Sequence, residues 1–383
     1  MTINVNLDTS IEFLKKLVNI NTGSYNQKGI QECVELLIEH FSTLNCVHEK
    51  IMRTDNKGTT HCTAITFSKY PKASKRCLLS IHLDTVFNPT SSFQIFKRLP
   101  NNQASGPGVI DAKGGIVILF NTLALLEQSK LNETLGWTVV ISTDEEIGSP
   151  YSKELLTQLG PKHDFALVFE PALENGDIIN QRPASSNITV TAKGKAAHAG
   201  RGATKGVNAI VHLLAFIQQL QAIIPLNSDT HTINIGTIQG GQRENIIPDN
   251  ATACLNARFM ADINLQSFLD QCQAIADHIN KTTQATLSVN IDSLRPSKPS
   301  TEHSVQLHNC LLQTSQDLGI TLNSHSSFGV SDANFIAATG IPVLDTIGAI
   351  GHGMHTTNET IQLDSLISRS HLLVTFLENY LQK

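Results

Sequence analysis

Apolar residues in the first 183 positions recur alternately at helical spacing and in short continuous runs. Ile11, Leu14 and Leu17 recur at the spacing of one helix face, as do the apolar residues of 28–44. Short apolar runs, typical of buried strands, alternate with further helical segments. We expect a helix over 9–20 with Asp8 or Thr9 as N-cap, helices over 28–44, 114–128 and 152–158, strands over 62–67, 76–82, 137–142 and 165–169, and a polar loop over 88–103. Strands alternating with helices predict an α/β fold with a mostly parallel, doubly wound sheet.

The pattern changes between Pro183 and Pro296. The expected order there is strand, helix, strand, strand, helix, strand, which is the ferredoxin-like split motif. We expect strands over 187–192, 230–237, 251–259 and 285–291, helices over 205–222 and 265–280, and, after Pro296, helices over 304–318 and 361–381 and a strand over 341–347. We therefore predict a discontinuous domain made of residues 1–184 and 297–383, with a second domain, residues 185–296, inserted into it.

Composition narrows the class of protein. The chain has 383 residues, enough for two domains that each have a core. Hydrophobic residues make up 40% and charged residues 16%, a balance typical of globular proteins. The net charge of −5 provides no basic surface for nucleic acid, and no apolar run approaches the ~18 residues of a membrane span. We therefore expect neither nucleic acid nor membrane as a partner.

The cysteines and the N-terminus indicate the compartment. The seven cysteines are an odd number and form no CxxC pair, which argues against a disulfide framework and against a thiolate zinc site. The N-terminal stretch MTINVNLDTSIEF lacks the basic segment and apolar core of a signal peptide. The simplest interpretation is a cytoplasmic protein with reduced thiols.

Residues of the kind that bind metals follow the strand-like runs or lie in glycine-rich loops. They are His82, Asp84, Asp111, Glu145, Glu146, Glu170, His352 and His355. Polar residues past the carboxyl ends of strands lie where open α/β sheets bind ligands. Histidines and carboxylates at one edge suit zinc with an open coordination position. A paired zinc site also needs a bridging carboxylate and a base for the attacking water, and this set contains enough carboxylates for both.

Each of these residues has a simpler interpretation when it is taken alone. His82 could be a structural histidine, Glu145 and Glu146 could form a solvated face, and an aspartate flanked by glycines, such as Asp111, is usually a turn residue. The coincidence of such residues at consecutive strand ends favours a common site. Spacing alone leaves both interpretations open.

Several motifs in chain order resemble a known family. They are HLDTV (82–86), GPGVIDAKGG (106–115), STDEEIGS (142–149), FEP (169–171) and the late His355 with Glu359. Together they resemble the dizinc peptidases and deacylases that include glutamate carboxypeptidase, acetylornithine deacetylase and succinyl-diaminopimelate desuccinylase. The motifs AHAG (197–200), GVNA (206–209) and NIIPDNATACLNAR (245–258) are similar to that family's dimerisation domain and, with SDA (331–333), are closest to the glutamate carboxypeptidase branch.

The resemblance implies a role for each residue of the set. Asp111 would bridge two Zn²⁺ ions per chain, for which Co²⁺ or Mn²⁺ could substitute. His82 and Glu170 would complete one zinc site, and Glu146 and His355 would complete the other. Glu145 would be the general acid and base, and Asp84 would orient His82. His355 is preferred to His352 because the family's ligand histidine is followed four positions later by an acidic residue, here Glu359. Ala112 departs from glutamate carboxypeptidase, which has a second aspartate there; other branches also lack an acid.

Further residues would bind the substrate. By the same resemblance, His198 would contact the reacting carbonyl in the partner subunit of a homodimer. Arg258 and Arg295 could bind a substrate carboxylate, because a planar guanidinium suits a carboxylate bidentately. Each arginine could instead form a surface ion pair. Asn245 could polarise the carbonyl or be a turn residue, and the loop FGVSDA could add donors from Gly329 and Ser331.

The expected function is that of a zinc-dependent hydrolase. It would cleave an amide bond, peptide or N-acyl, next to a free carboxylate, as a carboxypeptidase or dipeptidase does. An N-acyl-amino-acid deacylase would use the same site, and the sequence does not separate these two activities. A non-catalytic dimeric binding protein is the alternative from another class. It would be expected to lack the base or a ligand, whereas this sequence has all of them.

Overall fold

The chain folds into two compact units. The computed structural model describes residues 4–54, 58–129, 131 and 134–382. Unit 1 comprises Met1–Asn180, Ser300–Ser326 and Ser331–Lys383, and unit 2 comprises Gln181–Pro299 and Ser327–Val330. These divisions lie within a few residues of positions 184 and 296, and residues 327–330 are an addition to unit 2 that the sequence pattern does not predict.

Unit 1 is built on a six-stranded sheet with the order β1-β2-β6-β3-β7-β16. The strands β6, β3, β7 and β16 are parallel, and β1 and β2 add an antiparallel edge. In chain order the strands are β1 (Val47–Thr54), β2 (Thr60–Lys69), β3 (Lys75–His82), β6 (Leu135–Ser142), β7 (Phe165–Val168) and β16 (Val343–Leu344). The predicted mostly parallel sheet is confirmed.

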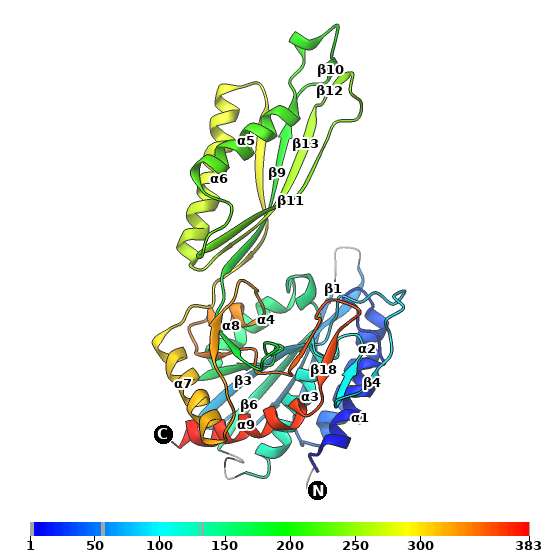
Figure 1. Cartoon of the computed structure of the whole chain (residues 1–383), viewed down its shortest axis with the longest axis vertical. Coiled ribbons are helices and arrows are strands. Elements are labelled where there is room, and N and C mark those ends of the chain that lie inside the picture. The colour runs from blue at the N-terminus through cyan, green and yellow to red at the C-terminus, as the bar shows by residue number, and fades with distance from the viewer. Residues whose placement is uncertain (1–3, 55–57, 130, 132–133, 383) are drawn as a thin grey trace. The chain divides into compact units, whose positions relative to one another are not determined.

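Helices cover both faces of this sheet (Figure 1). One face packs against α1 (Leu7–Val18), α2 (Gln27–Ser42), α3 (Lys113–Leu126), α7 (Glu302–Asp317) and α9 (Ser365–Leu381), and the other against α4 (Ser152–Leu159) and α8 (Ala333–Ala337). Because successive strand residues point to opposite faces, Leu79 joins the first core and its neighbour Leu78 joins the second. The fold is therefore doubly wound, as predicted.

Short strands and turns complete unit 1. A small sheet has the order β17-β18-β5-β4, and β15 pairs with β8. The elements are β4 (Lys97–Leu99), β5 (Gln103–Ser105), η1 (Glu145–Ile147), η2 (Gly160–Lys162), β8 (Ile178–Gln181), β15 (Ser324–Ser326), β17 (Gly351–His352) and β18 (Thr360–Gln362). The expectation of a plain loop over 88–103 is therefore wrong at its end, where β4 and β5 form a hairpin.

The first helix starts earlier than its predicted cap. Asn6, not Asp8 or Thr9, is the N-cap of α1: its side chain accepts a hydrogen bond from the Thr9 backbone N–H at 3.0 Å. The Thr9 hydroxyl oxygen in turn accepts from the Asn6 N–H at 3.3 Å. This reciprocal capping box satisfies donors that the helix itself leaves open.

Unit 2 contains the predicted ferredoxin-like order. Its four-stranded antiparallel sheet has the order β11-β13-β9-β14, and α5 and α6 pack on one face of it (Figure 1). The elements are β9 (Ala184–Lys193), β10 (Ala197–His198), η3 (Ala203–Lys205), α5 (Ala209–Ile223), β11 (His231–Gly240), β12 (Ile246–Ile247), β13 (Asn250–Phe259), α6 (Asp262–Thr282) and β14 (Thr286–Arg295). Within the described part of the chain, no helix has the length and apolar character needed to span a bilayer.

Candidate metal centre

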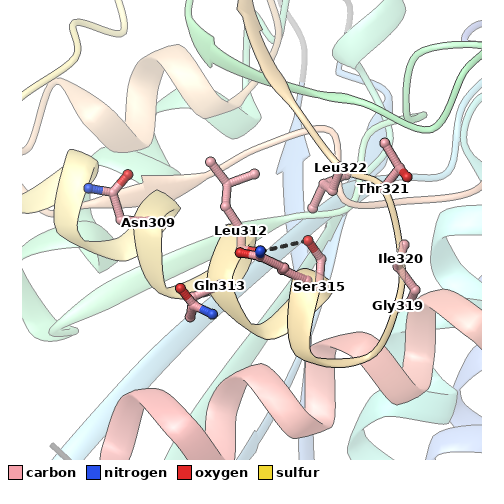
Figure 2. A pocket seen from close by; sticks show the side chains of 9 residues that line it. Asn309, Leu312, Gln313, Ser315, Gly319, Ile320, Thr321 and Leu322 are labelled. Atoms are coloured by element: carbon pink, nitrogen blue, oxygen red, sulfur yellow. Dashed lines mark hydrogen bonds between the residues drawn. The ribbon is translucent and has the colours of Figure 1, made fainter.

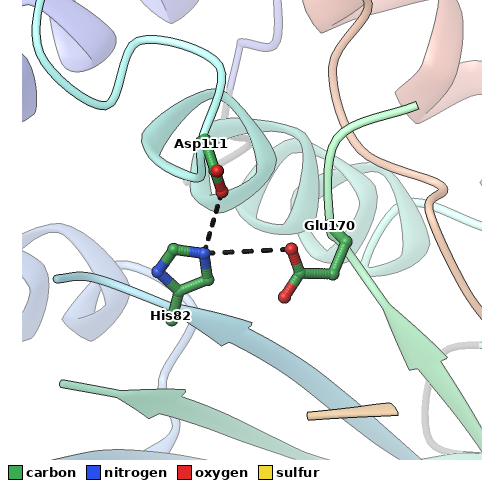
Figure 3. A group of neighbouring side chains, drawn as sticks. All are labelled: His82, Asp111 and Glu170. Atoms are coloured by element: carbon green, nitrogen blue, oxygen red, sulfur yellow. Dashed lines mark hydrogen bonds and ion pairs between the residues drawn. The ribbon is translucent and has the colours of Figure 1, made fainter. Parts of the chain in front are cut away.

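Three neighbouring parallel strands end at the same edge of the unit 1 sheet. His82 is the last residue of β3, and it pairs with Ser142, the last residue of β6. Glu170 follows the end of β7 by two residues. Asp111 comes from the loop before α3, and its side chain points toward His82 and Glu170 (Figure 3). The carboxyl ends of the strands therefore gather one histidine and two carboxylates at one point.

Asp111 is shared by two groups of potential ligands. In the first group, His82 Nε2 lies 3.0 Å from Asp111 Oδ1 and 3.8 Å from Glu170 Oε2 (Figure 3). In the second, His355 Nε2 lies 3.0 Å from Asp111 Oδ2 and 3.2 Å from Glu146 Oε2. The ligand atoms of each group lie within 4.8 Å of one another. Each carboxylate oxygen of Asp111 thus faces a different histidine, which is the arrangement a bridging carboxylate needs.

The electrostatics of both groups favour bound positive charge. Hydrogen bonds with Asp111 and Glu146 raise the pKa of His355 to about 10. Burial acts to lower the pKa of His82, but Glu170 and Asp111 outweigh it and raise that pKa well above its ordinary value. Burial likewise opposes ionisation of Asp111, yet the two histidines hold its pKa below the ordinary value. In both groups the carboxylates therefore stabilise positive charge at Nε2, which a bound metal ion would supply in place of the proton.

The donor set fits divalent metal ions. Imidazole nitrogen and carboxylate oxygen are ligands that zinc commonly takes in catalytic sites. Glu146 Oε1 is buried, and it has no hydrogen-bond partner among the residues that the structure describes. A buried carboxylate oxygen without a partner is costly unless a cation is near it. His82, Asp111 and Glu170 could hold one ion, and Asp111, Glu146 and His355 could hold a second.

Asp84 holds His82 and the following acidic turn together. It is fully buried, and its backbone carbonyl oxygen lies 3.0 Å from His82 Nδ1. A carbonyl only accepts, so Nδ1 carries the proton and Nε2 is left as a metal ligand. The Asp84 side chain accepts hydrogen bonds from the backbone N–H groups of Glu145 at 3.1 Å and Glu146 at 3.2 Å. Asp84 therefore positions the histidine with its backbone carbonyl and the glutamate pair with its carboxylate, whose Oδ1 also lies 3.5 Å from His82 Nδ1.

Glu145 and Glu146 are consecutive residues in a short turn, and they differ in their relation to the ligand groups. They begin η1, which is capped at its C-terminal end by Gly148 in the left-handed conformation (φ 91°). The Gly148 N–H donates to the Glu145 carbonyl at 2.8 Å. Only Glu146 belongs to a ligand group, and Glu145 belongs to neither. Glu145 thus directly precedes a grouped ligand in the sequence without being one itself.

The two candidate histidines near the C-terminus have different surroundings. His355 lies in the second ligand group and adopts a left-handed backbone conformation (φ 63°), which is uncommon for a residue other than glycine. A ring nitrogen of His352, by contrast, lies 2.8 Å from the hydroxyl oxygen of Thr360 on the paired strand β18. His352 is outside both groups, so the structure favours His355 as the candidate ligand.

Glu359 supports the Asp111 loop, a contact that the sequence motifs do not reveal. Its buried carboxylate accepts backbone N–H groups from Gly108 at 3.1 Å, Ile110 at 2.9 Å and Asp111 at 3.1 Å. Burial raises the pKa of Glu359 to about 7, although these hydrogen bonds oppose the shift. The only sequence signal was its spacing of four residues from His355. Glu359 therefore joins the segment that carries His355 to the loop that carries Asp111.

Arg258 and Arg295 lie on one face of the unit 2 sheet. Both pair with Ser185 of the central strand β9, from opposite sides. Residues directly opposite each other on neighbouring strands share a face, and this face points away from α5 and α6, because Ala184 belongs to the core beneath those helices. Burial, and then the charge of Arg295, lower the pKa of Arg258. The Arg258 guanidinium donates to Asn256 Oδ1 at 3.0 Å and to the Phe328 carbonyl at 2.6 Å.

His198 and Asn245 lie near each other at the end of unit 2. His198 pairs with Ile246 across β10 and β12, and the Asn245 carbonyl accepts the Ala199 N–H at 2.9 Å. His198 Nδ1 accepts backbone N–H groups from Gly200 at 3.1 Å and Arg201 at 3.3 Å. The ring proton is therefore on Nε2, and the exposed His198 can donate it to another molecule.

Gly329 and Ser331 lie in the loop that returns to unit 1. The Gly329 N–H donates to Ser327 Oγ at 3.0 Å, and a Cβ added at Gly329 would lie 3.4 Å from Arg182 Nη1. Ser331 is buried, and its hydroxyl oxygen accepts the Ala333 N–H at 3.3 Å at the start of α8. Gly329 thus lies beside an arginine of unit 2, whereas Ser331 serves a helix start in unit 1.

A hollow of about 600 Å³ near the end of α7 has an uncharged lining, unlike the metal centre (Figure 2). It is lined by Asn309, Leu312, Gln313, Ser315, Gln316, Gly319, Ile320, Thr321 and Leu322. None of these side chains is charged, and none is a metal ligand or an acid–base group. The chemistry of unit 1 therefore lies at the strand ends and not in this hollow.

Known proteins resemble the chain over much of its length. Carboxypeptidase G2 from Pseudomonas sp. (strain RS-16) is 27% identical over 365 residues, covering 94% of this chain and 87% of that protein. A succinyl-diaminopimelate desuccinylase from Gluconacetobacter diazotrophicus is 27% identical over 286 residues, covering 71% of this chain and 72% of that protein. The solved structure of a dinuclear metal-binding peptidase of the M20 family from Bacillus subtilis has a TM-score of 0.72 at 14% identity, covering 98% of each chain.

A match to a family model assigns the chain to a protein family. The model of peptidase family M20/M25/M40 matches residues 78–379, which is most of the sequence. The match begins in β3, before His82, and ends in α9, after His355. It therefore includes every residue of the two ligand groups and confirms the family that the motifs suggested. The chain is a hydrolase and belongs to peptidase family M20/M25/M40.

Proposed function

We propose that this protein is a dizinc hydrolase that cleaves an amide bond next to a free carboxylate, as a carboxypeptidase or dipeptidase does. The observation that carries the proposal is the shared Asp111 carboxylate, which faces His82 with one oxygen and His355 with the other. Glu170 and Glu146 would complete the two zinc sites. Co²⁺ or Mn²⁺ would be expected to substitute, because neither ligand type excludes them.

Glu145 is the proposed acid–base residue. Zinc ions bound at Asp111 would polarise the substrate carbonyl and lower the pKa of the attacking water toward ~7. Glu145 would accept the proton of that water and then give it to the leaving amine. The hydrogen bond from the Glu145 backbone N–H to Asp84 supports this role, because it fixes the turn that carries the Glu145 side chain.

His198 and Asn245 are the proposed carbonyl donors. Since two backbone N–H groups occupy Nδ1 of His198, its Nε2–H is directed outward as a donor. A preorganised donor stabilises the oxyanion that develops as water attacks, and it does so without reorganising at that moment. Asn245 would add a side-chain amide from the neighbouring β12 segment.

Arg258 and Arg295 are the proposed anchor for the substrate carboxylate. Their position on both sides of Ser185 supports a bidentate or shared contact with one anion. Gly329 and Ser331, in the loop FGVSDA, would add a backbone donor and a hydroxyl. A free carboxylate beside the scissile amide is common to peptides and N-acyl amino acids. A deacylase of the succinyl-diaminopimelate desuccinylase type is therefore the second candidate, supported by the relatives that carry that name.

A substrate panel tests the proposed function. Dipeptides, N-acyl glutamates, N-acetylornithine and N-succinyl-diaminopimelate would be offered to the zinc-loaded protein, each as the free acid and as the carboxamide. We expect amidation to cost about 2 kcal/mol or more in kcat/KM, because it leaves partly buried guanidinium groups without their anion. The preferred free acid would also separate peptidase from deacylase.

Arg258→Ala is the matched control for the panel. It should lower activity on the free acid and abolish most of the preference over the carboxamide, since the anchor is gone. Arg295→Ala, on the other side of Ser185, should act in the same direction. Equal cleavage of free and amidated substrates by the wild-type protein would show that the arginines do not bind the carboxylate.

A cytoplasmic homodimer is also part of the proposal. The edge strands β11 and β14 of the unit 2 sheet provide a natural pairing surface. Val211 and Leu214 on α5 are 55% and 50% exposed, so this helix carries apolar side chains that a partner copy could cover. All seven cysteines are free thiols, which supports a reducing compartment.

Subunit mixing tests whether His198 serves the partner's site. His198→Ala and Glu145→Gln homodimers should each be inactive. After exchange, the chain with intact Glu145 receives its histidine from the Glu145→Gln chain, so one site of each heterodimer should regain activity. Formation of the heterodimer is checked by native mass spectrometry with differently tagged chains. A mixture that exchanges but stays inactive would place His198 in its own subunit's site or outside catalysis.

A further inference from the structure

The segment Asn21–Ser24 runs alongside the residues that follow β3. The Thr85 N–H donates to the Thr22 carbonyl at 3.0 Å, and the Ser24 N–H donates to the Thr85 carbonyl at 3.2 Å. The Thr22 hydroxyl also donates to the Leu83 carbonyl at 2.8 Å. These bonds form a short parallel ladder around a bridge between Gly23 and Thr85. The segment between α1 and α2 is therefore fixed against the stretch that carries Asp84.

Gly23 allows this close approach. A Cβ at position 23 would lie 2.5 Å from the Phe87 carbonyl oxygen, which is closer than real contacts allow. The chain can therefore pass here only with glycine, and the next residue, Ser24, is brought to the side chain of Asp84. Its hydroxyl donates to Asp84 Oδ2 at 2.8 Å.

Ser24 differs from the other donors to the Asp84 side chain. The Glu145 and Glu146 N–H groups donate to Oδ1 and Oδ2, but they belong to the turn that Asp84 itself positions. Ser24 comes from a separate segment, 60 residues away in the sequence. The terminal torsion of an aspartate is soft and has broad minima, so a donor anchored elsewhere limits the rotation of this buried carboxylate.

We propose that Ser24 is a positioning residue of the metal centre. Its hydroxyl fixes the Asp84 carboxylate, which accepts the backbone N–H groups of Glu145 and Glu146 and has Oδ1 3.5 Å from His82 Nδ1. The proposal rests on the zinc hydrolase function proposed above. It assigns a role to a residue outside the family motifs, in a segment that the sequence pattern marks only as a connection between two helices.

The test compares three variants in the full-length protein. Ser24→Ala removes the donor, Ser24→Thr keeps a hydroxyl, and Thr22→Val removes the neighbouring hydroxyl that anchors the same segment without touching Asp84. For each variant, zinc retention is measured by competition with a chromogenic chelator. The values of kcat and KM are measured on the preferred panel substrate, and thermal stability is measured in the zinc-free state.

Ser24→Ala is expected to weaken zinc retention and lower kcat by about tenfold each, the low end of effects seen when a residue supporting a metal ligand is lost. KM should stay unchanged, because Ser24 does not bind substrate. Ser24→Thr should restore most of both values. Thr22→Val should lower thermal stability while keeping zinc retention and kcat near those of the wild type.

Two outcomes would overturn the proposal. In one, Ser24→Ala keeps wild-type zinc retention and kcat. In the other, Thr22→Val lowers them as much as Ser24→Ala, which would mean that only the fold of the segment matters. Zinc retention is measured without substrate, so it separates this proposal from the proposed function. If the wild-type protein retains zinc but cleaves no amide, that function is refuted, while zinc retention by Ser24→Ala still decides whether Ser24 supports the metal centre. A wild-type protein that retains no zinc refutes both.

Discussion

Replacing Glu145 with Gln is expected to lower kcat by about 10²–10⁴-fold, the range typical of losing a general base. Gln has nearly the same shape, but its amide oxygen cannot take a proton from water. The backbone N–H bond from residue 145 to Asp84 does not depend on the side chain, so the turn should stay in place. Both ligand groups should keep their metal. Steady-state kinetics and elemental analysis of the same preparation check both parts.

Glu146→Gln is the matched control, one residue further along the same turn. Glu146 Oε2 lies 3.2 Å from His355 Nε2, within the second ligand group. Loss of its charge should therefore weaken the binding of one metal ion, and added zinc should recover part of the activity. Added zinc should not rescue Glu145→Gln. If Glu145→Gln loses metal and Glu146→Gln keeps it, the assignment of the two glutamates is reversed.

Asp111→Ala is expected to remove both metal ions. The wild-type protein should approach two equivalents of metal per chain, because each oxygen of Asp111 faces a different ligand group. Without this carboxylate, His82 and Glu170 remain on one side, and His355 and Glu146 on the other, and neither pair has a third ligand from its group. Activity should fall to background, and zinc should no longer raise the melting temperature, since a ligand stabilises only a protein that binds it.

Glu170→Ala is the control that separates a shared ligand from an ordinary one. Glu170 belongs to the first group only, so this variant should lose one metal ion more readily than the other. Elemental analysis after dialysis against a weak chelator would record the stoichiometry of each variant. An Asp111→Ala protein that still holds two equivalents, or a wild type with one tight ion that Asp111→Ala leaves in place, contradicts the paired site.

The buried part of the fold was predictable because burial leaves a pattern in the sequence. The strands β3, β6 and β7 are continuous apolar runs, and each lies inside the sheet with helices on both faces. The edge strand β1 was not predicted. Almost all of its residues are exposed, so no apolar run marks it, and it exists because its backbone pairs with β2. Pairing of that kind depends on a partner strand and not on local pattern.

The candidate site likewise has a part that the sequence predicts and a part that only the structure reveals. Motifs singled out the residues that the structure gathers around Asp111, since each motif is local. The supporting contacts are between distant parts of the chain: Glu359 bonds to residues about 250 positions away, and Ser24 to a residue 60 positions away. A hydroxyl or carboxylate in a connecting loop has the same local appearance whether or not it reaches the site. The motif singled out Glu359 only by its spacing from His355, so the tertiary structure is needed to show its bonds to the Asp111 loop and to identify Ser24.

The order of the chain determines when the paired ligand groups can be completed during synthesis. His82, Asp111 and Glu170 precede the continuous part of unit 2, whereas His355 follows it, together with β16 and α9. Translation delivers the N-terminal parts first, and domains generally fold as units. Unit 2 can therefore form its four-stranded sheet before α7, β16, α9 and His355 of unit 1 have been synthesised. The second ligand group, and with it the proposed paired metal centre, can form only after the whole continuous part of unit 2 and His355 have been synthesised.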